Sequence, residues 1–174
     1  KRGQEVEGIP VFNSIKEAVK TVGKVDVSMT YVPPLMAHDA ALEAIENEVP
    51  LVEIFVEKMP ILDVSQVLFA AKKQGVRVLG PASVGAISPG EAKIGSIGGP
   101  NPDKVFTKGP VGVISKSGGM TSELSMLISA SGYGQSTAVG IGGDLLIGTS
   151  FSDLLLDFED DKQTKAVVAF GEVG

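Results

Sequence analysis

The segment VGVISKSGGMTSELSMLI, residues 111–128, constrains the fold most strongly, because it joins an apolar β-branched run to a helix through serines and glycines. Val111, Val113 and Ile114 predict a buried strand, and the apolar positions from Met120 to Ile128 share one helical face. Glycines let the backbone approach a ligand closely, and a helix N-terminus presents free N–H groups and about half a positive charge. Two interpretations follow: an anion cradle, or a turn that needs glycine for geometry and serine as a cap.

In the cradle interpretation, the amides of Gly118, Gly119 and Met120 and the hydroxyl of Ser117 face the anion. The turn is not a Walker A loop, because it lacks the Gly-Lys-Ser/Thr ending.

Helical and strand patterns alternate along the whole chain. The predicted helices lie at 15–22, 37–46, 62–73, 120–131 and 151–159. The predicted strands lie at 25–32, 51–56, 76–79, 111–115, 136–141 and 166–170. This α/β alternation favours parallel sheets with helices on both faces and ligands beyond the carboxyl ends of the strands.

The segment 80–109 interrupts this pattern with many glycines and prolines, which predicts loops or a short hairpin and then a linker. We therefore expect a domain boundary near 102–109, with one domain at 1–105 and a second at 106–174. The first domain opens without its first strand, and the second stops where a functional loop normally follows. We expect a fragment, or a chain incompletely represented, in which both domains are incomplete.

Composition excludes several function classes. No apolar run approaches the roughly 18 residues of a membrane span, and the N-terminus lacks the apolar core of a signal peptide. The absence of cysteine excludes a thiolate nucleophile and fits the cytosol. A net charge of −6 and the absence of tryptophan argue against nucleic-acid binding. A phosphate held by backbone amides needs no positive net charge.

Other candidate residues are weighed by position. Glu172 follows an apolar strand in a glycine-flanked turn, where catalytic carboxylates of parallel sheets occur. A second glycine cluster at 139–151 also follows a strand, but there Asp144 is interpreted as a turn residue that bonds its own backbone. The only histidine, His38, is interpreted as an exposed helical residue rather than a base or phosphoryl acceptor.

Several ordered motifs resemble one family over essentially the whole chain: EGIPVFNSIKEAV, YVPP, EVPLVEIFVEKMP, GPASVGAISPGEAKIG, GPVGVISKSGG, GYGQSTAVGIGGD and AFGEVG. The chain resembles the α subunits of succinyl-CoA synthetase (succinate–CoA ligase) and the related part of ATP-citrate lyase and citryl-CoA synthetase. The resemblance implies a Rossmann-like CoA-binding domain followed by a flavodoxin-like ligase domain. It also implies a nucleotide-dependent acid–CoA ligase with coenzyme A as cofactor.

In this family an ATP-grasp β subunit, or a fused equivalent, binds ATP or GTP with magnesium. Phosphate passes to a histidine, then to a small carboxylic acid as an acyl phosphate, which CoA displaces. The resemblance implies a hetero-oligomer without nucleic-acid or membrane partners and with no metal in this chain. It places the protein in the cytoplasm, or in the mitochondrial matrix of a eukaryote.

The resemblance also assigns individual residues. Ser117, Gly118 and Gly119 would hold the phosphoryl group, and Glu172 would steady the active-site histidine by fixing its tautomer. The implied CoA-binding residues are Lys1, Phe55, Val56, Glu57 and Ser83.

Some positions depart from the family pattern. The phosphorylated histidine of the family lies beyond the GEVG segment and is not in this chain, and the first CoA-binding glycine loop is missing. Ser122 stands where succinate enzymes have a tyrosine that meets the acid, and Ala82 replaces an asparagine. GPASVG and SKSGGM are closer to ATP-citrate lyase, whereas GYGQST is closer to succinyl-CoA synthetase. Citrate therefore remains an alternative to succinate.

Two other functions are weighed. A non-catalytic CoA-binding module fits a chain without the histidine. A Rossmann oxidoreductase is disfavoured, because no G-x-G-x-x-G follows a strand with an acidic residue about 20 positions further on.

Overall fold

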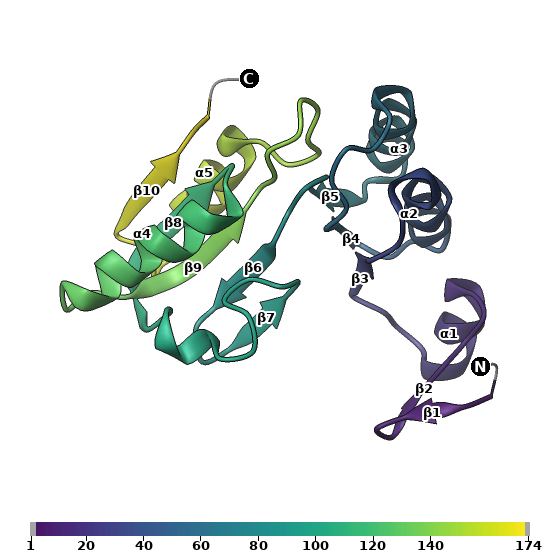
Figure 1. Cartoon of the computed structure of the whole chain (residues 1–174), viewed down its shortest axis with the longest axis horizontal. Helices are drawn as coiled ribbons and strands as arrows, with labels where there is room; N and C mark the ends of the chain where they lie inside the picture. The colour runs from purple at the N-terminus through teal and green to yellow at the C-terminus, as the bar shows by residue number, and fades with distance from the viewer. Residues whose placement is uncertain (1–2, 173–174) are drawn as a thin grey trace.

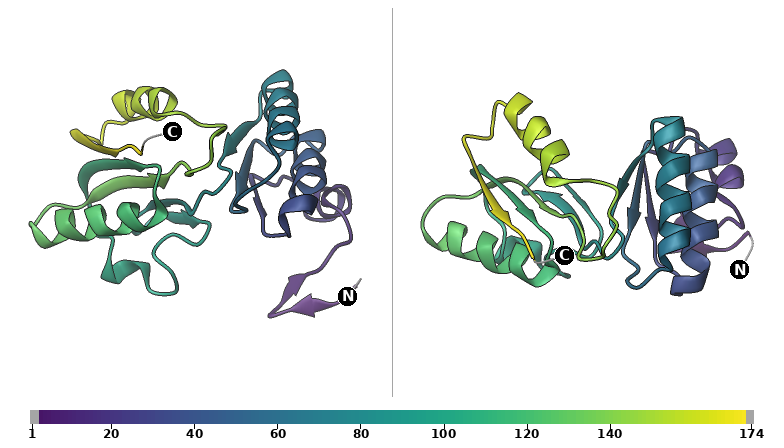
Figure 2. Two further views of the ribbon diagram at one scale, coloured as in Figure 1. Left: turned by 45° about the horizontal axis from the view of Figure 1, so that its top comes forward. Right: turned by 90° about the horizontal axis from the view of Figure 1, so that it is seen from above.

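The first unit of the computed structural model, which describes residues 3–172, is a three-stranded parallel sheet with helices behind it. Its strands lie in the order β3 (Val27–Thr30), β4 (Leu51–Ile54) and β5 (Arg77–Leu79). Its helices are α1 (Ile15–Val22), α2 (Ala37–Glu46) and α3 (Ile61–Gln74), with a 3-10 turn η1 at Pro34–Met36 and a hairpin of β1 (Glu5–Val6) and β2 (Ile9–Pro10). Figure 2 shows α2 and α3 on the sheet face that points away from the second unit.

The second unit is a five-stranded mixed sheet between two helices (Figure 1). Its strands lie in the order β10 (Ala166–Phe170), β8 (Lys108–Ser115), β9 (Gln135–Gly140), β6 (Gly85–Ser88) and β7 (Ala92–Ile94). Strands β10, β8 and β9 are parallel, whereas β6 runs antiparallel to β9 and β7. Helix α4 (Gly118–Ala130) contacts β8 and β9, α5 (Phe151–Asp160) contacts β10 and β8, and η2 spans Pro102–Lys104.

Neighbouring residues of β8 point to opposite faces of this sheet, as the pleat of a strand requires. Val113 belongs to the core beneath α4, which includes Leu124, and Ile114 belongs to the core beneath α5, which includes Phe158. Both faces of β8 are therefore buried, which explains its continuous apolar sequence.

The inner face of the three-stranded sheet is covered by the second unit instead of by helices. Met29 of β3 accepts a hydrogen bond from the Gly95 amide, with 3.1 Å between N and Sδ. Leu79 of β5 packs in one cluster with Ile94 of β7. The two units therefore share an apolar seam.

Most elements match the sequence prediction. The helices at 15–22 and 37–46 and the strand at 166–170 are confirmed residue by residue, and the other predicted elements differ by one to three residues at their ends. The expected α/β fold is confirmed, and a short hairpin, one of the two structures expected within 80–109, is present as β6 and β7. Two details differ from parallel sheets with helices on both faces: this hairpin adds antiparallel strands to the second sheet, and the first sheet carries helices on one face. The β1–β2 hairpin was not predicted.

The domain boundary at residue 105 stays a prediction. Sheet pairing places the hairpin of β6 and β7 with β9, so the chain crosses between the two sheets before that hairpin, at residues 80–84. Figure 1 shows this crossing as the segment between β5 and β6.

The crossing segment is held by backbone and side-chain hydrogen bonds to both sheets. The Ala82 amide donates to the Val56 carbonyl at 2.9 Å, and the Ser83 amide donates to the Ile54 carbonyl at 3.2 Å. The Ser83 hydroxyl donates to the Gly140 carbonyl of β9 at 2.7 Å. These bonds place the carboxyl ends of β4 and β9 next to each other.

No helix within residues 3–172 has the length and apolar character needed to cross a membrane, and no cluster of histidine and acidic side chains there is arranged to hold a metal ion.

Ala82 adopts a left-handed conformation, with φ of 59°, which side chains with a Cβ disfavour by roughly 1–2 kcal/mol. We expect Ala82→Gly to raise the free energy of unfolding by about 0.5–1 kcal/mol, because glycine accepts this conformation without steric cost. The matched change Ala70→Gly, inside α3, should lower it by about 1 kcal/mol. Urea denaturation measures both, and destabilisation by Ala82→Gly would contradict the strain assignment.

Candidate functional site

A pocket of about 290 Å³ lies where the carboxyl ends of strands from both sheets meet. Each segment that lines it directly follows a strand or, in the case of Ala82, belongs to the crossing between the sheets. The lining residues are Glu57, Ala82, Lys116, Ser117, Gly118, Gly143, Asp144 and Glu172. The predicted phosphate-binding residues Ser117 and Gly118 and the predicted Glu172 and Glu57 thus lie around one cavity, whereas the predicted Gly119, the next residue of α4, does not line it.

The first turn of α4 supplies hydrogen-bond donors to this pocket. Ser117 is the N-cap, and its hydroxyl accepts from the Met120 amide at the long distance of 3.4 Å. Within residues 3–172, the amides of Gly118 and Gly119 donate to no other protein group. These two amides and the Ser117 hydroxyl are free to bind an anion at the positive end of the helix dipole.

The turn before α4 is fixed by its own hydrogen bonds. The Ser115 hydroxyl donates to the Ser117 carbonyl at 2.8 Å and accepts from the Ser117 amide at 3.0 Å. The Lys116 amide donates to the Phe170 carbonyl at 3.0 Å, which extends the β8–β10 pairing into the turn. The donors are therefore preorganised.

Packing, in addition to ligand binding, requires a residue without a side chain at position 118. A Cβ at Gly118 would overlap a methyl group of Val84, and a Cβ at Gly140 would overlap the other. Val84 thus occupies the space between two glycines at the start of α4 and the end of β9. At Gly119 a Cβ would meet nothing within 4 Å.

The same pocket is rich in acidic residues. Glu57, Asp144 and Glu172 all line it, and among the described residues Lys116 is the one cationic residue in the lining. Burial raises the pKa of Asp144, a hydrogen bond from the Lys58 backbone opposes this rise, and the charge of Glu57 adds to it. Amide donors and carboxylate acceptors therefore face the same cavity.

A second, mostly apolar pocket of about 600 Å³ adjoins the first through Glu57, which lines both. Its walls come from the segments after β3 and β4: Tyr31, Val32, Pro33, Pro34, Phe55, Val56 and Glu57. The rings of Tyr31 and Phe55 stack with centroids 4.7 Å apart and planes inclined by 8°. The predicted CoA-binding residues Phe55, Val56 and Glu57 thus lie in one groove.

Other predicted residues lie elsewhere. Ser83 is 1% exposed, and its hydroxyl forms two hydrogen bonds, one to the Gly140 carbonyl and one from the Gly85 amide. Ser122 is half-buried on α4 and does not line the pocket at the start of this helix. Lys1 lies outside the described residues. His38 lies on α2, with its Nδ1 2.8 Å from an Asp39 oxygen.

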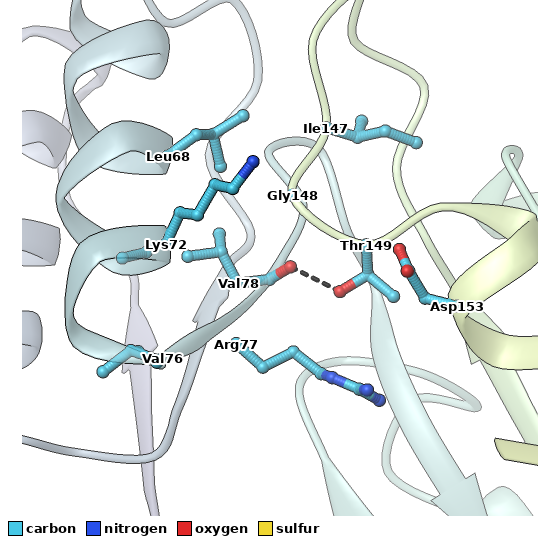
Figure 3. Close-up of a pocket in the computed structure, with 11 residues that line it drawn as sticks. Leu68, Lys72, Val76, Arg77, Val78, Ile147, Gly148, Thr149 and Asp153 are labelled. Carbon is cyan, nitrogen blue, oxygen red and sulfur yellow. Dashed lines mark hydrogen bonds between the residues drawn. The ribbon is translucent and has the colours of Figure 1, made fainter.

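A third pocket, of about 500 Å³, lies on the seam between α3 and the loop before α5 (Figure 3). Two of its lining residues are joined by a hydrogen bond, in which the Thr149 hydroxyl donates to the Val78 carbonyl at 2.6 Å. Arg77 pairs with Asp157 across the same seam, and this hydrogen bond raises the pKa of Arg77. These contacts join the two units.

Among the lining residues that the sequence analysis did not assign to the site are Tyr31, Lys116 and Asp144. All three stand within a few residues of a strand's carboxyl end, which was the signal that identified Glu172. Which strand ends meet depends on sheet order, and this order was not readable from periodicity.

We expect Gly118→Ala to lower the free energy of unfolding by about 1–3 kcal/mol, because the new methyl group must displace Val84 or the first turn of α4. Gly119→Ala is the matched control one residue further along. With open space around its Cβ, it should leave stability unchanged or raise it by up to about 1 kcal/mol. Chemical denaturation of both variants tests this, and equal effects would contradict the packing role of Gly118.

Comparison with known proteins agrees with this geometry. Residues 1–58 match the CoA binding domain family and residues 114–174 match the CoA-ligase family. The chain is 41% identical to the succinate–CoA ligase [ADP-forming] subunit alpha 2 of Archaeoglobus fulgidus and 43% identical to a subunit alpha of Staphylococcus aureus. Both alignments include the whole chain and cover 59% and 56% of these relatives.

Among solved structures, ATP citrate lyase from Methanothrix soehngenii, in complex with citrate and coenzyme A, superposes with a TM-score of 0.89 at 29% identity. The match covers 95% of this chain and 28% of that one. The chain spans somewhat more than half the length of its curated relatives. The resemblance expected from the motifs is confirmed: the chain is similar over its whole length to succinate–CoA ligase alpha subunits, and its fold is similar to part of an ATP citrate lyase.

Proposed function

We propose that this chain is the CoA-binding and phosphohistidine-handling part of a nucleotide-dependent acid–CoA ligase of the succinyl-CoA synthetase type. One observation carries the proposal: Glu57 lines both the apolar groove and the pocket at the start of α4. A ligand in the groove can therefore extend a reactive end to an anion bound at the helix. An acyl phosphate and a CoA thiol need this proximity in order to react.

The groove suits coenzyme A. Its stacked rings of Tyr31 and Phe55 are 50% and 39% exposed and offer an aromatic wall to an adenine or a pantetheine arm. Val56 and the two prolines add apolar surface, and a pocket of this kind binds a ligand largely through its apolar lining.

The second pocket suits a phosphorylated imidazole. The free amides of Gly118 and Gly119 would bind phosphoryl oxygens, as helix N-termini do. The carboxylates of Glu172 and Asp144 accept hydrogen bonds and would hold the ring N–H, fixing its tautomer. A plain anion would need no acidic wall, whereas a phosphoryl group attached to a basic ring explains both halves of the pocket.

The remaining parts of the reaction belong to a partner. We assign the nucleotide, ATP or GTP with magnesium, to an ATP-grasp subunit or fused domain, and the histidine to a part of the protein beyond this sequence. The name "subunit alpha" of the relatives supports a hetero-oligomer. We place the reaction in the cytoplasm, or in the mitochondrial matrix of a eukaryote, which the absence of cysteine supports.

The acid is proposed to be succinate, with citrate as the second candidate. The curated relatives favour succinate, and the structural similarity to a citrate-bound lyase favours citrate. Ser122 is the residue of this chain proposed to meet the acid, and Ser83 and Lys1 remain proposed CoA contacts. Comparing CoA-dependent ADP release with succinate and with citrate distinguishes the two acids.

We expect the chain to bind CoA, and Phe55→Ala to weaken binding about tenfold, because it removes half of the aromatic wall. Tyr133→Ala is the matched control, since Tyr133 is 66% exposed and lies outside the groove. Isothermal titration calorimetry with CoA measures both. If the Phe55→Ala and Tyr133→Ala variants bind CoA with equal affinity, the groove is not the CoA site.

In the full-length protein with its nucleotide-binding partner, we expect Glu172→Gln to slow the appearance of acid-labile phosphate from γ-labelled ATP by about 10–100-fold. The change keeps the size of the side chain and removes its charge. Glu123→Gln, on the exposed side of α4, should label at the normal rate. Absence of labelling in the unmodified protein would rule out the ligase proposal, and normal labelling of Glu172→Gln would remove Glu172 from it.

A further inference from the structure

Glu53 on the central strand β4 is a completely buried carboxyl group without a partner. Its exposure is 0%, and neither of its oxygens forms a hydrogen bond within residues 3–172. An ionised carboxylate in such a place lacks both water and a counter-ion, which is strongly unfavourable. The group is therefore sensitive to its protonation state.

The position of Glu53 is set by the sheet register. It lies between Met29 of β3 and Leu79 of β5, and parallel neighbours point to the same side of a sheet. Met29 accepts the Gly95 amide and Leu79 packs with Ile94, so this side faces the β6–β7 hairpin. Glu53 thus lies in the seam between the two units, which Figure 2 shows between the first sheet and the second unit.

Few charged groups face this seam. The titratable phenol of Tyr31 follows β3, and β5 contributes Arg77, which is already paired with Asp157. On the hairpin, Lys93 alternates with Ala92 and Ile94, so it points to the other side, and its ammonium donates to the Gly99 carbonyl. None of these groups forms a salt bridge with Glu53, and the Gly80–Ser83 crossing brings no charge.

The coenzyme groove lies directly beyond Glu53 on the same face. Phe55 is the next residue of this face after Glu53, and Tyr31, which stacks on it, is the next after Met29. Burial raises the pKa of the Tyr31 phenol, the charge of Glu53 raises it further, and a hydrogen bond with Ser96 opposes both. Tyr31 therefore senses Glu53 and at the same time forms a wall of the groove.

We propose that Glu53 is a proton-controlled latch of the groove: protonated, it keeps the seam closed and the Tyr31–Phe55 wall in place, and ionised, it draws water and the Tyr31 phenol toward itself and loosens that wall. The ligand consequence rests on the proposed CoA function, whereas the movement of Tyr31 does not. Binding in the groove and proton uptake by Glu53 are then linked, and each favours the other.

The direction of the pH effect follows from burial, which raises the pKa of Glu53 to about 7. An unfolded chain loses this proton near the ordinary glutamate value of about 4.3, whereas the folded protein keeps it until about 7. The contribution of Glu53 to stability is therefore fully present below the unfolded pKa and is lost as pH rises through the folded one. In the proposal, the Tyr31–Phe55 wall is closed below about pH 7, where Glu53 is protonated.

The tyrosine content permits a direct test. The chain has two tyrosines and no tryptophan, so Tyr133→Phe leaves Tyr31 as the only strong intrinsic fluorophore. In this background we expect the fluorescence of Tyr31 to change with a midpoint near pH 7, as Glu53 titrates. Adding Glu53→Gln, which keeps the size and removes the charge, should abolish the transition. A transition that persists in Glu53→Gln, or none in the parent, overturns the latch.

CoA affinity supplies the second readout. If only the protonated state holds the wall, affinity of the unmodified chain should fall about tenfold between about pH 6 and about pH 8. The Glu53→Gln chain is the control for the ionisation of CoA itself, so at each pH the CoA affinity of the unmodified chain is divided by that of this variant. If this affinity ratio is the same at about pH 6 and about pH 8, the link between Glu53 and binding is wrong. If neither protein binds CoA, the proposed function fails, while the Tyr31 titration still decides the latch.

Glu53→Leu tests the same proposal if the Glu53→Gln variant folds poorly. An apolar side chain in this apolar seam should keep the wall closed at every pH, and it should raise the urea midpoint more at about pH 8 than at about pH 5. An equal rise at both pH values would contradict the ionisation of Glu53 in the seam.

Discussion

The structure depends on one geometric constraint: parallel strands of two different sheets end at the same place. The crossing at residues 80–84 creates this arrangement, because Ser83 bonds the first sheet through its amide and the second through its hydroxyl. Every side chain of the pocket at the start of α4 is delivered by a strand end or by this crossing. A site built on strand ends has a rigid base and variable loops, which suits precise positioning.

The pocket that results has two chemically different halves. The start of α4 contributes Ser117 and Gly118, and the amides of a first helical turn have no intrahelical partners. The other side offers the carboxylates of Glu57, Asp144 and Glu172. Because burial and, to a smaller extent, the charge of Glu57 raise the pKa of Asp144, these carboxylates favour a ligand that brings positive charge or an N–H group. In the proposed function, a phosphohistidine is that ligand.

The seam between the two units combines apolar packing and hydrogen bonds, which hold the units together, with one buried carboxyl group whose ionisation depends on pH. Leu79 and Ile94 pack together, Thr149 bonds the Val78 carbonyl, and Arg77 pairs with Asp157. Glu53 of β4, in contrast, has no hydrogen-bond partner among residues 3–172. Its burial costs stability above neutral pH, and it lies beside the aromatic wall of the groove. Such a cost is reasonable where a proton is used to control binding.

The local sequence was enough to predict the helices, most strands, the N-cap at Ser117 and the position of Glu172 just after a strand, because periodicity, capping and strand ends are properties of neighbouring residues. It also carried the family motifs. Only the tertiary structure decided that the 85–94 hairpin joins the second sheet, that Glu57 is shared by two pockets and that Ser83 forms hydrogen bonds with both sheets. It also decided that Glu53 is buried with no hydrogen-bond partner among residues 3–172. These facts depend on which strands become neighbours, and this choice is made by packing between residues far apart in the chain.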